Sequence, residues 1–252
     1  MKIKVCSFNT RTEGAKDGIN CFDNRAERII EVIEREMPDV IGFQEPGSRC
    51  SAFLKEKLKD YTVLGCGRCA EYNGEGVRLA FLRDKFDLVS FETFWLSVTP
   101  AAPNSTYGGD QSGCPRTAQI AKLVPAGGGT PFNFCNTHLD HKGADAKKFG
   151  MMQIMQRLMA EPYKFVLTGD FNSVPDSAPI ELITTGTVRK VTDATANLVS
   201  TFHGFGTREA PYKIDYIFTD GEPAGESYTA EDEHPDGIYY SDHNAVFCEI
   251  EL

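Results

Sequence analysis

The sequence has no long apolar stretch and no hydrophobic leader. A membrane-spanning helix needs about 18 or more consecutive apolar residues, and the chain contains no such run, so we expect no membrane span. The first residues, MKIKVCSFNT, enter a strand-like pattern directly and lack the apolar core of about 7–15 residues that marks a secretion signal. We expect a cytoplasmic protein, with export open only if an upstream signal peptide has been removed.

Positive charge is also scarce. Lysine and arginine number 26 against 36 aspartate and glutamate residues, which gives a net charge of −10. Tight nonspecific binding of long nucleic acids relies on basic residues that neutralise phosphates, and the chain has no long basic or aromatic-rich insertion. The balance favours a small molecule or a short single-stranded nucleic acid as the binding partner, and nothing indicates an obligate protein partner.

Cysteine is present but does not form a convincing metal or disulfide pattern. Cys6, Cys135 and Cys248 lie inside apolar strand-like runs, where a thiol packs as a small hydrophobic group. Cys66 and Cys69 form a single C-x-x-C, which is a poor zinc signature without a second pair of ligands. A thiol-based redox protein built on this pair is an alternative that predicts activity insensitive to chelators and lost on Cys66→Ser.

The length and composition indicate one α/β domain spanning residues 1–252. Of these residues, 41% are apolar and 25% are charged, as in ordinary globular proteins. A capping-box-like pair, Asn24 and Glu27, predicts the start of a first helix that ends at Met37-Pro38. A second helix should run through Leu54 and Leu58. Apolar patterns predict a third helix at about 143–160 and strands at 61–66, 77–83, 86–95, 117–124, 131–137 and 163–168, which suits mixed sheets covered by helices.

Polar residues follow or end strand-like apolar runs in six segments. The segments are SFNTR with Asn9, IGFQE with Glu45, NTHLDH with His138, LTGDFNS with Asp170 and Asn172, KIDYIF with Asp215, and YSDHNAV with Asp242 and His243. One rim of a sheet could collect all of them. Carboxylate and amide oxygens without a cysteine ligand suit Mg²⁺ or Mn²⁺, and nearby histidines could handle phosphate charge or protons.

These six segments, in this order, resemble the endonuclease/exonuclease/phosphatase superfamily from residue 5 to residue 247. GDFN followed by a C-terminal SDH is the most specific part. The stretches TFWLS, NTHLDH and TFHGF are similar to the small bacterial members, which are related to the deadenylase-like branch. The resemblance implies a four-layer α/β sandwich of two stacked mixed β-sheets flanked by helices, a divalent metal, and hydrolysis of a phosphate ester.

The resemblance implies a metal site on the Glu45 side of the rim. Glu45 would be the main ligand, Asn9 would orient the water shell of the metal or the phosphate, and Asp242 would contribute to the metal side. Without the resemblance, Glu45 would be read as a solvated strand-end charge and Asn9 as a turn or cap residue.

The catalytic residues expected are Asp170, Asn172, His138, His243 and Asp215. Asp170 would deprotonate the attacking water and Asn172 would donate to a phosphoryl oxygen, since a spacing of two places both on one side of an extended segment. A simple Asx turn after a strand fits these two residues equally well. We expect His138 to pair with Asp215, which would favour its protonated form, and His243 to face the phosphate.

Arg116, at the start of a strand, would bind a nonbridging phosphate oxygen, although a strand-end arginine can also be a solvated rim charge. Further substrate contacts are expected from residues in loops at the same rim. These are His141, Arg25, Tyr107 and His203.

The sequence thus predicts a Mg²⁺- or Mn²⁺-dependent hydrolase that cleaves a phosphomonoester or phosphodiester by in-line attack of water. A nuclease acting on RNA or DNA ends is the alternative within this class. A noncatalytic binding module of the same fold would predict a damaged residue among the six segments, and all six are intact. The identity of the substrate, the number of metals and the oligomeric state stay open.

Overall fold

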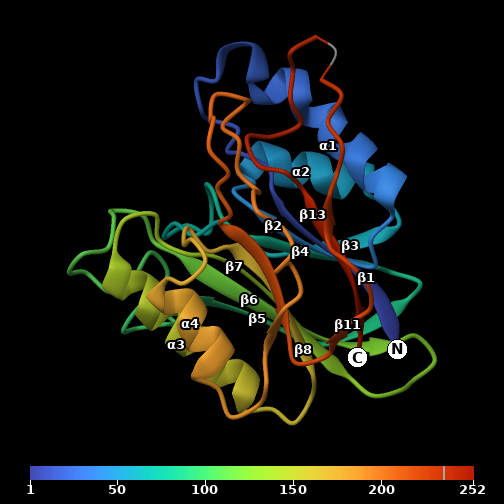
Figure 1. Ribbon diagram of the computed structural model, residues 1–252, viewed down its shortest axis with the longest axis vertical. Helices are drawn as coiled ribbons and strands as arrows, with labels where there is room; N and C mark the ends of the chain where they lie inside the picture. Colours follow the sequence, from blue (N-terminus) through green and yellow to red (C-terminus); the bar gives the residue numbers. More distant parts are fainter. Residues whose placement is uncertain (235) are drawn as a thin grey trace.

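A computed structural model describes residues 1–234 and 236–252. Two β-sheets stack face to face, and helices cover the outer face of each (Figure 1). The helices are η1 (Gly18–Asn20), α1 (Phe22–Glu36), α2 (Ser48–Lys57), α3 (Ala144–Met159) and α4 (Ala178–Thr185). The strands are β1 (Lys2–Asn9), β2 (Val40–Gln44), β3 (Tyr61–Leu64), β4 (Arg78–Leu82), β5 (Phe86–Trp95), β6 (Thr117–Pro125), β7 (Phe132–His138), β8 (Phe165–Asp170), β9 (Thr192–Asp193), β10 (Asp215–Thr219), β11 (Glu222–Pro223), β12 (Tyr228–Thr229) and β13 (Val246–Glu251). The expected four-layer α/β sandwich is confirmed.

Each sheet contains one central parallel pair among antiparallel neighbours. The first sheet has the strand order β11-β13-β1-β2-β4-β3, with β12 also paired to β13, and β1 and β2 run parallel. The second has the order β5-β6-β7-β8-β10-β9, with β7 and β8 parallel. Parallel strands end at the same edge of a sheet, so each central pair delivers its C-terminal residues to one rim.

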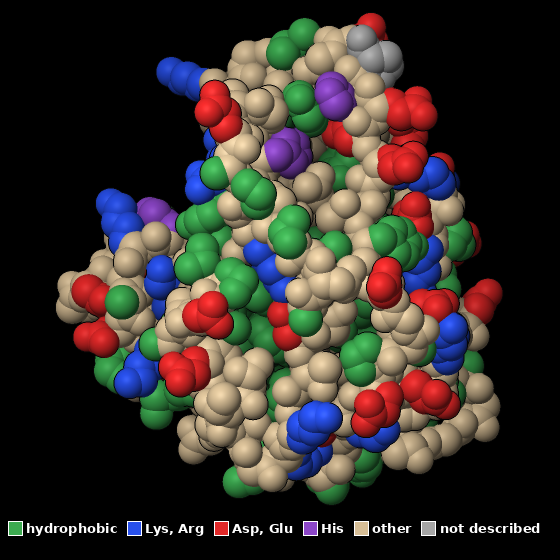
Figure 2. Space-filling model, viewed as in Figure 1, with side chains coloured by type: hydrophobic (Ala, Val, Ile, Leu, Met, Phe, Trp, Pro, Cys, Tyr) green, Lys and Arg blue, Asp and Glu red, His purple; other side chains and the backbone are tan. Residues whose placement is uncertain are grey.

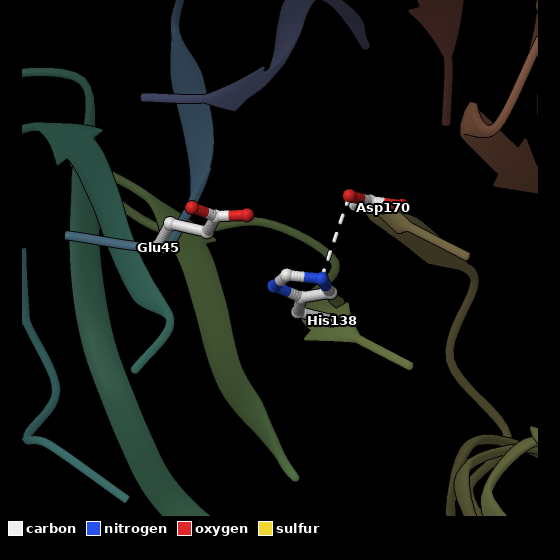
Figure 3. A group of neighbouring side chains, drawn as sticks. All are labelled: Glu45, His138 and Asp170. Atoms are coloured by element: carbon white, nitrogen blue, oxygen red, sulfur yellow. Dashed lines mark ion pairs between the residues drawn. The ribbon is translucent and has the colours of Figure 1, made fainter. Parts of the chain in front are cut away.

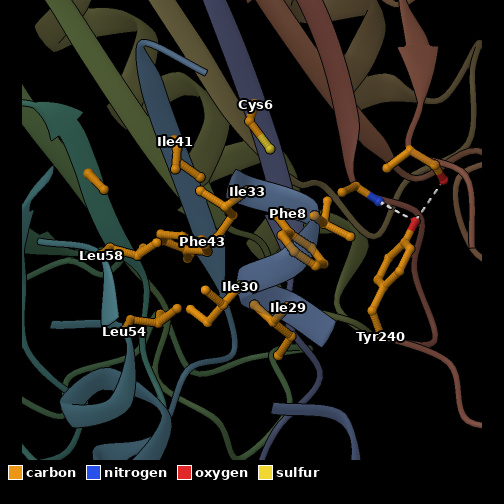
Figure 4. Packing of buried hydrophobic residues seen from close by; sticks show 14 of the residues in the cluster. Cys6, Phe8, Ile29, Ile30, Ile33, Ile41, Phe43, Leu54, Leu58 and Tyr240 are labelled. Atoms are coloured by element: carbon orange, nitrogen blue, oxygen red, sulfur yellow. Dashed lines mark hydrogen bonds between the residues drawn. The ribbon is translucent and has the colours of Figure 1, made fainter. Parts of the chain in front are cut away.

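The helix α1 covers the first sheet because its apolar residues recur on one face. Ile29, Ile30 and Ile33 are buried against Phe8 and Phe43 of β1 and β2 (Figure 4). In Figure 1, α1 and α2 lie over this sheet while α3 and α4 lie on the outer face of the second.

The predicted N-cap of α1, Asn24, is wrong by three residues. The helix begins at Phe22 after Cys21, and the Asn24 side chain donates to the carbonyl of Ile19 instead of capping the helix. The predicted end is confirmed: Met37 adopts a left-handed conformation with φ of 45°, and Pro38 cannot continue the helix.

The cysteines behave as the sequence indicates. All eight are free thiols, and Cys6, Cys135 and Cys248 are buried within β1, β7 and β13. Burial raises the pKa of Cys50 to about 12, which keeps that thiol protonated and unreactive. Within the described residues, no helix has the length and apolar character that crossing a bilayer requires.

Candidate active site

The strand ends of both sheets meet at one rim and bring most of the expected residues together there. Asn9 ends β1, Glu45 follows β2, and His138 and Asp170 end β7 and β8. Asp215 begins β10, where it pairs with Asp170 across an antiparallel ladder. A chain folded into two sheets can therefore place side chains from residues 9 to 243 around one centre.

The Asn9 amide joins carboxylates from the two sheets. Its Nδ2 donates to Glu45 Oε1 at 3.1 Å and to Asp170 Oδ2 at 3.0 Å. Its Oδ1 accepts from the Arg11 backbone N–H at 2.9 Å, so the oxygen faces away from the two carboxylates. We expected Asn9 to orient the water shell of the metal or the phosphate. Its amide nitrogen instead holds Glu45 and Asp170 close to each other, and its oxygen is used by the Arg11 N–H.

Glu45 reaches the rim because the chain leaves β2 in an unusual conformation. Its φ of 67° is in the left-handed region, which non-glycine residues rarely adopt. The carboxylate Oε2 accepts from the Thr12 backbone N–H at 2.8 Å. Figure 3 shows Glu45, His138 and Asp170 converging, and one ligand atom from each lies within 4.8 Å of the others.

The expected pairing of His138 with Asp215 is wrong. His138 Nε2 lies 3.4 Å from Asp170 Oδ2 and accepts from Asn172 Nδ2 at 3.0 Å. Asp215 instead lies 2.9 Å from His243 Nδ1 and accepts from Thr201 Oγ1 at 2.6 Å. Asp215, which pairs with Asp170 across β8 and β10, contacts His243 in the segment before β13, a contact that sequence spacing does not reveal.

The two histidines consequently differ in charge. Burial, with Arg116 nearby, lowers the pKa of His138 well below its usual value, so this imidazole is neutral. Burial would also lower the pKa of His243, but the Asp215 carboxylate raises it to about 10. His243 is thus the charged imidazole of the site at neutral pH, and its Nε2 lies 3.8 Å from Asp170 Oδ2.

Asp170 and Asn172 are in a turn and not in an extended segment. The strand β8 ends at Asp170, Asn172 has a φ of 46°, and its backbone N–H donates to Asp170 Oδ1 at 2.9 Å. The Asx-turn interpretation is therefore correct, yet the turn lies at the centre of the site. Burial, reinforced by Asp215, raises the pKa of Asp170 to about 7.

Asp242 lies at the edge of this group. Its Oδ2 is 3.4 Å from Arg11 Nη1, and burial raises its pKa. Arg11 was not singled out from the sequence. It also binds Asp17 with two hydrogen bonds, of 3.0 and 2.9 Å, and so ties the loop after β1 to the rim.

Two arginines, Arg116 and Arg68, lie on the side of the site where β6 begins. The Arg116 side chain is buried, and its Nη2 donates to His141 Nδ1 at 3.1 Å. Burial, with Arg68 nearby, lowers the pKa of Arg116. Arg68, which sequence reasoning missed, pairs with Glu75 at 2.8 Å. The next residue, Gly76, donates its N–H to the carbonyl of Pro46, which follows Glu45. The loop that follows β3 therefore lines the site; the C-x-x-C that it carries, Cys66 and Cys69, gave no indication of this position.

The structure separates the other expected substrate contacts. Arg25 has no exposed surface, and its guanidinium donates to backbone carbonyls of Thr10, Arg11, Asn20 and Tyr240. A direct contact with substrate does not fit such a side chain, which instead supports the loop after β1 from below.

Tyr107 and His203 contact different parts of the molecule. The Tyr107 hydroxyl donates to Gln153 of α3, and its ring contacts Phe149 of the same helix, so Tyr107 packs against α3. His203 lies closer to the site, because its backbone N–H donates to the carbonyl of Asp242 at 3.0 Å. Its ring contacts Tyr239 at 5.0 Å between centroids, and burial lowers its pKa to about 4.

Comparison with a family model decides the class of protein. Residues 6–243 match the Endonuclease/Exonuclease/phosphatase family, which is nearly the whole chain. The chain belongs to this family. The endonuclease/exonuclease/phosphatase family consists of enzymes that cleave phosphate esters, the class that the six sequence segments indicate.

Solved structures of similar proteins agree with the family. An endonuclease/exonuclease/phosphatase from Bacteroides vulgatus is 28% identical, with a TM-score of 0.91 over 100% of this chain and 99% of that one. The mannosyl-6-phosphatase Bt3783 of Bacteroides thetaiotaomicron shares the fold at 24% identity, with a TM-score of 0.84 over 99% of this chain and 100% of that one. An uncharacterised protein, L388, of Acanthamoeba polyphaga mimivirus is 24% identical over 160 residues, which is 60% of this chain and 59% of the viral protein.

The site of this family member offers the donor set of a hard divalent cation. Glu45 and Asp170 contribute carboxylate oxygens, and within the described residues neither carboxylate pairs with a lysine or arginine. Burial raises the pKa of Asp170, and the neighbouring Asp215 and Glu45 carboxylates raise it further, to about 7, so carboxylates are crowded at this position. Oxygen ligands from clustered carboxylates are what Mg²⁺ and Mn²⁺ prefer.

Proposed function

We propose that this protein hydrolyses a phosphate ester with the help of a divalent cation, Mg²⁺ or Mn²⁺, held by Glu45. The observation that carries the proposal is the Asn9 amide, which brings Glu45 and Asp170 from opposite sheets to the two sides of one nitrogen. A cation bound there would offset the charge of the phosphate group.

Asp170 is positioned to act as the base for the attacking water. Its Oδ1 is held by the Asn172 backbone N–H, which leaves Oδ2 directed at Asn9, His138 and His243. A pKa of about 7 matches a group that accepts a proton at neutral pH.

The phosphate has donors on the remaining sides. The charged His243 is fixed through Nδ1 by Asp215, which leaves its Nε2 as the donor to the phosphate. Both hydrogens of Asn172 Nδ2 are used on His138 Nε2 and the Leu139 carbonyl, so Asn172 holds His138 in place and does not itself donate to the phosphate. Arg116 adds a second fixed cation from β6. Donors fixed before the substrate binds stabilise the charge of a pentacoordinate phosphorus without reorganisation, which is the largest contribution available to such an enzyme.

The substrate is a small phosphate ester or the end of a short single strand. On the face in Figure 2, basic side chains are interspersed with acidic ones and form no continuous stripe. The net charge of −10 opposes binding of long nucleic acids. The mannosyl-6-phosphatase with the same fold supports a sugar phosphate as the first compound to test.

The decisive experiment is turnover with added Mg²⁺ or Mn²⁺ against the same assay in EDTA. The panel should contain a sugar phosphate, a chromogenic phosphodiester, an RNA oligomer and a DNA oligomer. Cation-dependent cleavage of the sugar phosphate is expected, whereas cleavage of an oligomer alone would favour the nuclease alternative. Asp170→Asn should abolish turnover while the fold is retained; unchanged activity would refute the role of Asp170 as base.

A further inference from the structure

Three strands that end at the site share the same sequence of side-chain types on the face between the two sheets. Each passes from an apolar residue to a small polar residue and then to a site residue, in steps of two. The triplets are Val5, Ser7 and Asn9 on β1; Phe134, Asn136 and His138 on β7; and Val166, Thr168 and Asp170 on β8. Because side chains alternate along a strand, each triplet points the same way.

The middle members form a buried polar layer directly beneath the site, together with Gln44 of β2. We call Ser7, Gln44, Asn136 and Thr168 the inter-sheet layer. All four side chains are buried, with at most 1% of their surface exposed. The layer contains members from both sheets, and each member precedes a site residue by one or two positions.

Asn136 is the centre of the layer and uses every hydrogen-bonding position of its amide. Its Nδ2 donates to the backbone carbonyls of Phe43 at 2.8 Å and Arg78 at 3.0 Å, both in the opposite sheet. Its Oδ1 accepts from Gln44 Nε2 at 2.7 Å and from Thr168 Oγ1 at 3.1 Å. One side chain of β7 is therefore bonded to both sheets at a fixed separation.

Gly42 shows how closely the sheets approach at this level. A Cβ atom at Gly42 would lie 2.0 Å from Thr168 Oγ1 and 2.6 Å from Asn136 Oδ1, distances that no side chain tolerates. Glycine is required here because the opposite sheet occupies the space of a side chain. The inter-sheet layer thus sets a shorter and more specific spacing than an interdigitated apolar layer would.

We propose that the inter-sheet layer is a positioning element that holds Glu45 and Asp170, which come from different sheets, at the separation that one cation and one phosphate require. This inference rests on the proposed function, because it assumes that the site binds a cation and a phosphate. Buried polar networks contribute little net stability compared with apolar packing, but satisfied polar groups specify one arrangement of the elements they join. The Asn136 amide is satisfied at every position, whereas Gln44 Oε1 has no partner among the described residues. A shift of the sheets would pass directly to the site, because Glu45 follows Gln44 and Asp170 is two residues from Thr168.

Thr168→Val tests the proposal, because valine keeps the shape of threonine and removes the hydroxyl, whose single hydrogen is shared between Asn136 Oδ1 at 3.1 Å and the Cys135 carbonyl at 3.2 Å. The matched control is Thr219→Val. Thr219 is the last residue of β10, and its buried hydroxyl donates to the Phe165 carbonyl at 2.7 Å. We expect both variants to lower the Tm by similar amounts. Thr168→Val alone should lower kcat by about tenfold and Mn²⁺ affinity severalfold, as loss of supporting residues around metal sites does. Thr168→Ser, which keeps the hydroxyl, should restore both values.

The proposal is overturned if the Tm of Thr168→Val falls as much as that of Thr219→Val while its kcat and Mn²⁺ affinity stay those of the parent protein. If Thr168→Val does not fold, Gln44→Met serves as the second test. It removes the other donor to Asn136 Oδ1, which comes from the opposite sheet, and should lower kcat and Mn²⁺ affinity in the same way. A parent protein that neither turns over esters nor binds Mn²⁺ would refute the proposed function instead. In that case crystal structures decide on the positioning role: the Asn9–Asp170 hydrogen bond should be broken in Thr168→Val and intact in Thr219→Val.

Discussion

His243 Nδ1 and Asp215 Oδ2 lie 2.9 Å apart, and this contact joins the chain just before β13 of one sheet to the first residue of β10 in the other. Thr201 Oγ1 donates to the same carboxylate oxygen at 2.6 Å. The Asp215 carboxylate accepts both of these hydrogen bonds and raises the pKa of His243, which holds the imidazole protonated beside Asp170. The pair therefore supplies a fixed positive charge where negative charge would develop on a phosphate.

Asp215→Asn should move the alkaline limb of the pH profile. In the parent protein the Asp215 charge overcomes burial and raises the pKa of His243 to about 10, so His243 loses its proton only as the pH rises through about 10. Without that charge, the pKa of His243 falls, because burial lowers it and only the Asp242 and Asp170 carboxylates still raise it. We expect the alkaline limb to move to lower pH and kcat/KM at the original optimum to fall on the order of 100-fold. Asp193→Asn, which removes the partner of Lys213, should leave the limb in place.

Glu45→Gln should uncouple the protein from the cation while the fold is retained. In the parent protein, Mn²⁺ at about 100 times its Kd should stabilise the folded state by about 2.7 kcal/mol, and EDTA should reverse this. The variant should show no change in Tm on addition of Mn²⁺ and at least a 100-fold loss of turnover. Glu36→Gln, far from the site in a pair with Lys4, is the control. A Mn²⁺-dependent Tm in Glu45→Gln would remove Glu45 from the cation site.

Arg25→Lys should reduce stability and not substrate binding. The guanidinium supplies donors to four backbone carbonyls in a site with no exposed surface, and an ammonium group cannot reproduce this fork. We expect a loss of about 3 kcal/mol in the free energy of unfolding, measured by denaturant titration. KM should be unchanged well below the Tm. A raised KM with an unchanged Tm would instead support the contact with substrate that the sequence suggested.

Asp140→Asn should reduce stability at neutral pH and flatten its dependence on acid. Burial alone would raise the pKa of Asp140, but hydrogen bonds from Ser112 and Gly143 lower it to about 2. A lowered folded-state pKa contributes stability above the unfolded value of about 4, and this contribution disappears as the pH falls toward 2. We expect the variant to lose about 2 kcal/mol at pH 7 and little at pH 2. Asp84→Asn, at an exposed position, should change neither value by a comparable amount.

The sequence by itself determined the class of the protein, most elements and the residue types of the site. Alternating apolar residues in β5, β6 and β7 and the apolar face of α3 depend on local periodicity, which is readable without a partner strand. Polar residues after apolar runs mark strand ends for the same reason, so Glu45 and Asp170 could be singled out directly.

Only the tertiary structure decided which of those residues touch. The partner of Asp215 is His243 and not His138, because the β8–β10 register and the entry to β13 set that distance. The conformation at Asn172, the burial of Arg25 and the layer around Asn136 likewise depend on contacts between residues far apart in the chain. Local sequence encodes which face a side chain occupies; the distance between two side chains is set by how the sheets stack, and that is determined by the whole core.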